Sequence, residues 1–157
     1  MNVVLVEPEI PQNTGNIART CAGLGAILHL VRPLGFSTSD RYLKRAGLDY
    51  WEHVDVRYYN SLEEVFDINH DANFYFCTTK AQNIYTELKY GIGDFFIFGK
   101  ETKGLDEGLL IKNYDKCIRI PMKPNIRSLN LANSVAVILY EAYRQNGFMD
   151  LELKGEI

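Results

Sequence analysis

The sequence of 157 residues has few cysteines, and their number and spacing exclude the common cysteine-based sites. The three, Cys21, Cys77 and Cys117, are far apart in the chain and odd in number. This pattern is typical neither of a zinc site nor of a disulfide framework. We therefore expect buried, reduced thiols, as in a protein of the cytoplasm.

Long apolar runs and a targeting segment are also missing. No apolar run reaches the roughly 18 residues that a membrane-spanning helix needs. The first seven residues lack the basic start and the cleavage site of a signal peptide and instead predict a buried strand. The net charge of −3 at pH 7 gives no general attraction for nucleic acid. We therefore expect a cytoplasmic protein with no membrane partner, which could bind RNA only through a local basic patch.

The usual patterns for nucleotides and metals are absent as well. Residues 23–25, Gly-Leu-Gly, follow an expected helix instead of a strand and lack the third glycine of a dinucleotide-binding turn. Residues 99–102, Gly-Lys-Glu-Thr, do not have the order of a phosphate-binding loop. The histidines have no metal-ligand spacing and are expected in structural or surface roles: His29, His53 and His70. The sequence therefore predicts no metal site.

What is present is an alternation of short apolar runs and helical patterns, without repeats or linkers. The expected strands are Val3–Val6, Ile27–Val31, Val54–Tyr58, Phe74–Cys77, Phe95–Phe98 and Cys117–Ile120. Most are continuous apolar runs, which are typical of strands covered on both faces. The expected helices are one with Ile17, Cys21 and Leu24 on one face, residues 40–46, one opened by a capping box of Ser61 and Glu64, residues 105–113, and a long C-terminal helix. The alternation predicts one α/β domain over residues 1–157, with a parallel sheet flanked by helices.

The C-terminal helix has an unusual apolar pattern. Ser128 or Asn130 can cap its start, and Gly147 lies where its end is expected. Residues 135–139 are apolar on every side, whereas a helix that only covers a core has a polar face. We therefore expect this helix to serve both the core and the interface of a homodimer.

Three stretches follow expected strands, and parallel sheets bind ligands where their strands end. In residues 11–20, Asn16 and Arg19 share one helical face. In residues 95–105, a strand stops at Gly99 and a charged loop closes at Gly104. The third is the proline-containing loop before the last helix. Each alone is also compatible with an ordinary turn or helix cap, but three at one end of a sheet favour a shared site.

These stretches resemble the three ordered motifs of the SPOUT RNA methyltransferases. The matching segments are Asn-Thr-Gly-Asn-Ile-Ala-Arg-Thr (13–20), Phe-Gly-Lys-Glu-Thr-Lys-Gly-Leu (98–105) and Ile-Pro-Met-x-Pro-x-x-Arg-Ser-Leu-Asn-Leu-Ala-Asn-Ser-Val-Ala-Val (120–137). Within this superfamily the chain most resembles the small bacterial TrmL type, the tRNA (cytidine(34)-2′-O)-methyltransferases. The resemblance extends from the first expected strand to about Gly147, nearly the whole chain.

The resemblance implies a C-terminal deep trefoil knot and a homodimer packed through the first and last helices. It implies S-adenosylmethionine as the cofactor, with no metal, held largely by backbone groups at Cys77, Gly99, Ile120, Ser128 and Leu129. It also implies 2′-O-methylation of the wobble nucleotide 34, cytidine or modified uridine, in the anticodon loop of tRNA. Relatives act on Leu isoacceptors. Cys77 stands where relatives often have Leu, and Lys100 and Asp106 where they often have Pro; none of these changes removes a side chain that the chemistry needs.

The resemblance assigns catalysis to Arg19, with Asn16 orienting it or the ribose. An arginine is a poor base because its pKa is above about 12, so stabilising a developing alkoxide or binding a phosphate is easier to defend. Ser128, Asn130 and Asn133 are supporting candidates, and Glu101 is expected to fix its loop. The expected RNA-binding residues are Arg41, Arg45, Lys103, Arg127, Asn133 and Tyr140.

Three alternatives stay open at this point. One is methylation at another tRNA or rRNA position, since sister enzymes share these motifs. Another is a non-catalytic RNA-binding module, which retention of Asn16, Arg19 and Glu101 argues against. The third is a flavodoxin-like binding protein, which bound flavin would reveal.

Overall fold

The computed structural model describes residues 1–37 and 50–155, and within these residues it contains one parallel sheet of seven strands. The strands are β1 (Asn2–Val6), β2 (Ile27–Val31), β3 (Val56–Tyr59), β4 (Phe74–Cys77), β5 (Asn83–Ile84), β6 (Phe95–Phe98) and β7 (Cys117–Arg119). Their order is β3-β2-β1-β6-β4-β7-β5, and every pair is parallel. The helices are α1 (Pro11–Leu24), α3 (Leu62–Ile68), α4 (Glu107–Lys112), the 3-10 helix η1 (Tyr114–Lys116) and α5 (Leu131–Gln145). The predicted α/β class with a parallel sheet is confirmed.

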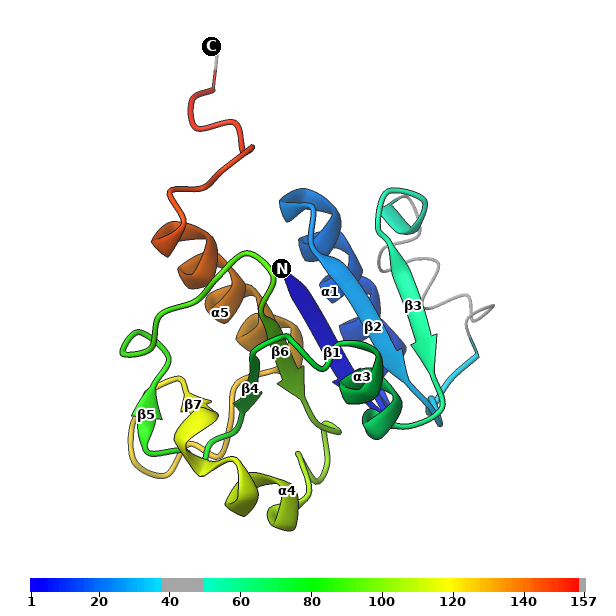
Figure 1. Ribbon diagram of the computed structural model, residues 1–157, viewed down its shortest axis with the longest axis vertical. Helices are drawn as coiled ribbons and strands as arrows, with labels where there is room; N and C mark the ends of the chain where they lie inside the picture. Colours follow the sequence, from blue (N-terminus) through cyan, green and yellow to red (C-terminus); the bar gives the residue numbers. More distant parts are fainter. Residues whose placement is uncertain (38–49, 156–157) are drawn as a thin grey trace.

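Helices cover both faces of the sheet, with α1 and α5 side by side on one face (Figure 1). Alternate residues of each strand point to opposite faces. Val3 and Leu5 of β1 therefore pack in the core layer with α1 and α5, while Val4 packs in the layer with α3 and α4. This two-sided burial explains why the strands are continuous apolar runs.

The helix ends have identifiable caps, one of which differs from the prediction. Ser61 caps α3 by accepting a hydrogen bond from the backbone N–H of Glu64 at 3.2 Å. The Glu64 carboxylate accepts from the N–H of Asn60 at 2.7 Å instead of that of Ser61, so the predicted capping box is shifted by one residue. Asn130 caps α5, and Ser128 does not.

Some strand bounds differ from the expected ones, and one short strand was not predicted. β3 begins at Val56, because the N–H of Val54 closes a turn on the carbonyl of Trp51 at 3.4 Å. β5 has only two residues, too few for an apolar pattern to reveal it. β7 ends at Arg119, one residue before Ile120. The helix expected at residues 40–46 lies outside the described residues.

The remaining expectations about the fold concern the knot, the domain count and the absence of a membrane-spanning helix. The trefoil knot and the single domain over residues 1–157 stay predictions. None of the described helices has the length and apolar character needed to cross a membrane. The last described residues, after α5, extend away from the body of the molecule (Figure 1).

His29, in the middle of β2, is the largest buried polar side chain of the sheet. Its Nδ1 lies 2.9 Å from the hydroxyl of Tyr59, and its Nε2 lies 3.0 Å from the amide oxygen of Asn2. The Asn2 oxygen can only accept, so Nε2 carries the proton and Nδ1 accepts from the tyrosine. Burial, followed by the nearby Arg57 cation, lowers the pKa of His29 to about 4.

This lowered pKa predicts a loss of stability in mild acid. Between pH 6.5 and 4 the unfolded chain binds a proton at His29 that the folded chain does not bind, so stability falls as the pH falls. We expect the free energy of unfolding in urea to drop by ~2 kcal/mol between pH 7 and pH 5. A His29→Gln variant should show a much flatter dependence over the same range. Equal slopes for the two proteins would contradict the assignment.

Candidate functional site

A cavity of about 560 Å³ lies where β4, β6 and β7 end, and all three motif loops contribute to its wall. Five residues that the resemblance assigned to the cofactor line it together: Cys77, Gly99, Ile120, Ser128 and Leu129. Lys103 and Arg127, expected to bind RNA, line it too. The three motif loops, which the sequence suggested to be neighbours, thus form one cavity.

The floor of this cavity is apolar and its rim is polar. Phe98, Ile118 and Ile138 form part of the floor, and each is almost completely buried. At the rim, Lys80 forms an ion pair with Glu107 at the start of α4. Burial raises the pKa of the Cys77 thiol well above its usual value, so this side chain lines the cavity as a neutral group and not as a thiolate.

Gly99 is required by a close backbone crossing at the end of β6. A Cβ atom at this position would lie 2.1 Å from the carbonyl carbon of Gly104 and 2.3 Å from the nitrogen of Leu105. The loop closes there because the N–H of Gly104 donates to the carbonyl of Lys100 at 2.8 Å. Gly104 itself has φ of 71°, a left-handed conformation that glycine adopts readily. The backbone thus requires glycine at position 99 for lack of space and favours it at position 104 for its left-handed conformation.

Glu101, in this loop, binds the segment that follows β1. Its carboxylate accepts from the N–H groups of Glu9 at 2.8 Å and Ile10 at 3.2 Å, and from the side-chain amide of Asn13 at 3.1 Å. Three donors on one carboxylate fix the loop against the start of α1. The prediction that Glu101 holds its loop agrees with this geometry.

Asn13 extends the connection to the third motif. Its amide oxygen accepts from the side-chain nitrogen of Asn130 at 2.9 Å. The Asn130 oxygen in turn accepts from the backbone N–H groups of Ala132 at 2.9 Å and Asn133 at 3.4 Å, which caps α5. Asn13 is only 5% exposed. One buried side chain thus joins all three motifs, and the sequence interpretation did not single it out although it opens the first motif.

A second set of contacts joins the same two segments. The Glu9 carboxylate accepts from the N–H of Thr102 at 3.1 Å and from its hydroxyl at 2.8 Å. These hydrogen bonds lower the pKa of Glu9. Glu7 forms an ion pair with Lys100. The segment after β1 and the loop after β6 therefore bind each other reciprocally, which no local sequence signal indicates.

Asn16 and Arg19 lie on α1 beyond the cavity, and neither lines it. Both are exposed, as their shared helical face predicted. The guanidinium of Arg19 lies over the ring of Tyr50, 4.8 Å from its centroid. Of this region only Ile10 and Asn13 line the cavity of the same chain, and the catalytic roles of Asn16 and Arg19 stay predictions.

The other predicted RNA-binding residues lie away from the cavity or outside the described part. Asn133 and Tyr140 are exposed on α5, with Tyr140 52% exposed. Beside them, Ala136 and Val137 are half-buried, so the apolar helix keeps one open side in the single chain. Arg41 and Arg45 lie outside the described residues.

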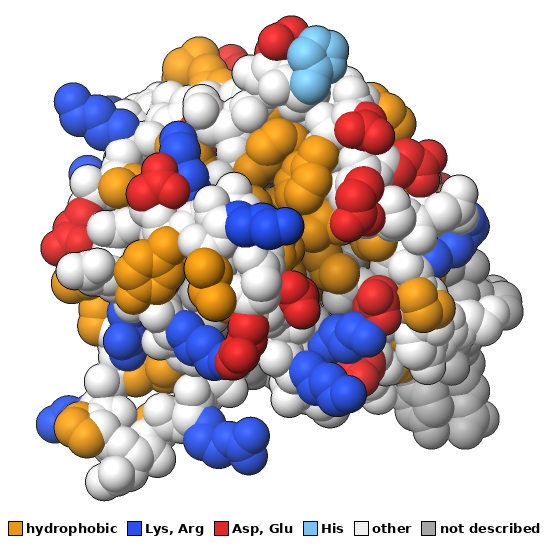
Figure 2. Space-filling view, turned by 60° about the horizontal axis from the view of Figure 1, so that its bottom comes forward, with side chains coloured by type: hydrophobic (Ala, Val, Ile, Leu, Met, Phe, Trp, Pro, Cys, Tyr) orange, Lys and Arg blue, Asp and Glu red, His pale blue; other side chains and the backbone are white. Residues whose placement is uncertain are grey.

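Charges are mixed on the side where the strands end. Figure 2 shows acidic and basic side chains interspersed over this face, with apolar side chains visible between them. In the described ranges, no group of His, Cys, Asp or Glu side chains could hold a metal ion. The side chains visible on this face therefore do not create an electrostatic field of a single sign.

Comparison with known proteins identifies relatives of this arrangement. The SpoU rRNA Methylase family matches residues 1–140. A relative from Bacillus subtilis is 53% identical over 155 residues, which cover 97% of each chain. A relative from Yersinia pestis named tRNA (cytidine(34)-2′-O)-methyltransferase is 43% identical over 160 residues, covering 98% of this chain and 99% of the relative.

Solved structures show the same fold. One, reported with structural insights into the 2-OH methylation of C/U34 on tRNA, has a TM-score of 0.89 and 46% identity, covering 93% of this chain and 95% of that chain. The SpoU methyltransferase AviRb from Streptomyces viridochromogenes, solved with its cofactor AdoMet, has a TM-score of 0.83 at 24% identity and covers 97% of this chain and 59% of that chain. The chain therefore belongs to the SpoU methylase family, in the branch of the tRNA (cytidine(34)-2′-O)-methyltransferases.

Proposed function

We propose that this protein transfers a methyl group from S-adenosylmethionine to the ribose 2′-oxygen of the wobble nucleotide 34, cytidine or modified uridine, of tRNA, with Leu isoacceptors as substrates. The supporting observation is the single cavity in which the three motif loops meet, joined by the bonds of Glu101, Asn13 and Asn130. The names of the relatives at 43% identity and above support the substrate. We place the enzyme in the cytoplasm, where tRNA is available.

The cavity has the properties that S-adenosylmethionine needs. Its volume of about 560 Å³ lies in the ordinary range for cofactor-sized ligands. The floor can accept an adenine ring, and the tight turn at Gly99 exposes backbone groups to the ligand. When bound, S-adenosylmethionine supplies an electrophilic methyl group on a sulfonium sulfur. The residues of the chain must align the ribose with that methyl group, which can provide much of the rate.

Arg19 is the residue we assign to the reacting oxygen. As the 2′-hydroxyl loses its proton, negative charge develops on the oxygen, and a guanidinium stabilises it electrostatically. A neighbouring phosphate could be held by the same fork of donors. Asn16, one turn earlier on the same helix, would orient the ribose.

Because Arg19 does not line the cavity of its own chain, this assignment requires a homodimer in which one protomer supplies Arg19 to the cavity of its partner. The open side of α5, with Ala136, Val137 and Tyr140, lies on the same face of the sheet as α1. We propose that this face is the dimer interface. The C-terminal knot and the single domain over residues 1–157 belong to the same proposal.

The direct test is to map the product. Purified protein should transfer labelled methyl from S-adenosylmethionine to tRNA, and nuclease mapping should place the label on the 2′-oxygen of nucleotide 34. Label at another nucleotide would replace the substrate assignment. Unlabelled RNA, with the protein folded, would rule out the activity.

The shared site can be tested by mixing two inactive variants. Arg19→Ala removes the proposed catalytic cation but keeps the cavity. Gly99→Ala keeps Arg19 but distorts the loop that lines the cavity, because the added Cβ would clash with the backbone of Gly104. Each homodimer should be inactive, and Arg19→Ala should still bind S-adenosylmethionine in calorimetry. Co-expression of both chains should restore about a quarter of the wild-type sites, because half of randomly formed dimers hold one intact site.

The mixture separates the two possible arrangements. If Arg19 acted on the cavity of its own chain, every mixed dimer would carry a defect in both sites and no activity would return. Two controls test folding and assembly. In the first, each variant is expressed alone, and in the second, each variant is co-expressed with the wild-type chain.

A further inference from the structure

Within the described residues, the ring of Tyr50 forms a cation–π contact with the guanidinium of Arg19. The guanidinium carbon lies over the tyrosine ring, 4.8 Å from its centroid. Among the described residues no carboxylate forms an ion pair with Arg19. Within the described residues, the arginine is therefore held through the face of an aromatic ring and not by a counter-charge.

This type of contact suits a cation that must act on something else. The five N–H donors of a guanidinium lie in its plane. A carboxylate would occupy two of them and neutralise the charge. A ring face attracts the cation without using a donor, and it restricts a side chain that is otherwise flexible. As far as the described part of the chain is concerned, the contact with Tyr50 orients Arg19 and leaves its donors and its charge available.

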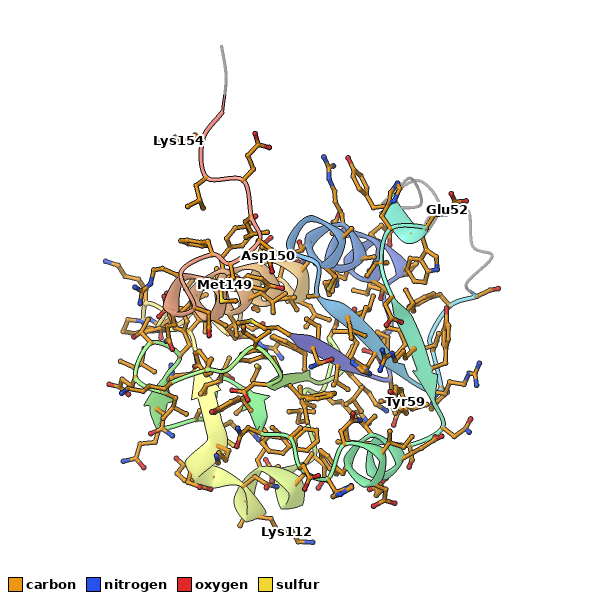
Figure 3. All side chains as sticks on the ribbon, turned by 45° about the horizontal axis from the view of Figure 1, so that its top comes forward. Glu52, Tyr59, Lys112, Met149, Asp150 and Lys154 are labelled. Atoms are coloured by element: carbon orange, nitrogen blue, oxygen red, sulfur yellow. The ribbon has the colours of Figure 1, made fainter. Side chains whose placement is uncertain are left out.

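Tyr50 is itself fixed to the body of the protein. It begins a turn in which the N–H of His53 donates to the Tyr50 carbonyl at 3.0 Å. Trp51 and Val54, in the same turn, pack against the core layer that contains Ile17 of α1. Figure 3 labels Glu52 on this turn, which lies beside α1. The ring is therefore presented by a segment anchored to the same layer as the arginine.

We infer that Tyr50 is a positioning residue for catalysis, which orients the Arg19 guanidinium toward the ribose oxygen. This inference rests on the proposed methyl transfer. An alternative role for Tyr50 is stacking on an RNA base, but Arg19 occupies the face of its ring in the free protein.

The test replaces the ring and measures the steps of the reaction separately. Tyr50→Leu should lower kcat about five- to twentyfold, while KM for tRNA and the affinity for S-adenosylmethionine stay at wild-type values. Tyr50→Phe, which keeps the ring face, should retain wild-type kcat. Tyr58→Leu is the matched control, since Tyr58 holds Arg32 in the same way, at 5.4 Å, and should leave kcat unchanged.

Each other outcome is informative. A wild-type kcat for Tyr50→Leu would overturn the inference while leaving the methyltransferase activity intact. A rise in KM for tRNA with unchanged kcat would overturn it in favour of base stacking. Equal losses in Tyr50→Phe and Tyr50→Leu would show that the hydroxyl and not the ring face matters. If the wild-type protein transferred no methyl group to tRNA, both the proposed function and this inference would be overturned.

Discussion

The site depends on the side chain of Asn13, which donates one hydrogen bond to Glu101 and accepts another from Asn130. A side-chain amide can do both, because its NH2 group donates and its carbonyl oxygen accepts. An aspartate would face the Glu101 carboxylate with a second negative charge, and an apolar residue would leave both partners unbonded. Because Asn13 is buried, each lost bond would cost about 1–3 kcal/mol. The contact joins segments that are separated by most of the chain.

Other parts of the molecule position the three loops that Asn13 joins. The parallel sheet brings the three motif loops to one edge, and helices on both faces exclude water from the strands. The loop between Gly99 and Gly104 closes so tightly that a side chain at position 99 would clash with the backbone of Gly104. Arg19 lies exposed on α1, where its guanidinium contacts Tyr50. Our proposal therefore assigns cofactor binding and catalysis to different surfaces of one chain.

Most of the fold could be predicted from the sequence, because strands buried on both faces leave continuous apolar runs. β2, β4 and β6 have the predicted bounds. The two-residue strand β5 left no pattern, and the shifted bond of Glu64 depends on backbone geometry. At the site, motif spacing predicted which loops meet. It could not show the bonds of Asn13 and Glu9, since these depend on how distant segments pack, nor that Arg19 lies outside the cavity.

The claim that one buried amide organises the site can be tested by comparing two asparagines of the same helix. Calorimetry should measure S-adenosylmethionine binding to folded Asn13→Ala and Asn16→Ala variants. We expect at least a roughly tenfold loss of affinity for Asn13→Ala, because Glu101 and Asn130 each lose a bond. Asn16→Ala should bind like the wild type. Wild-type affinity in a folded Asn13→Ala variant would contradict the account.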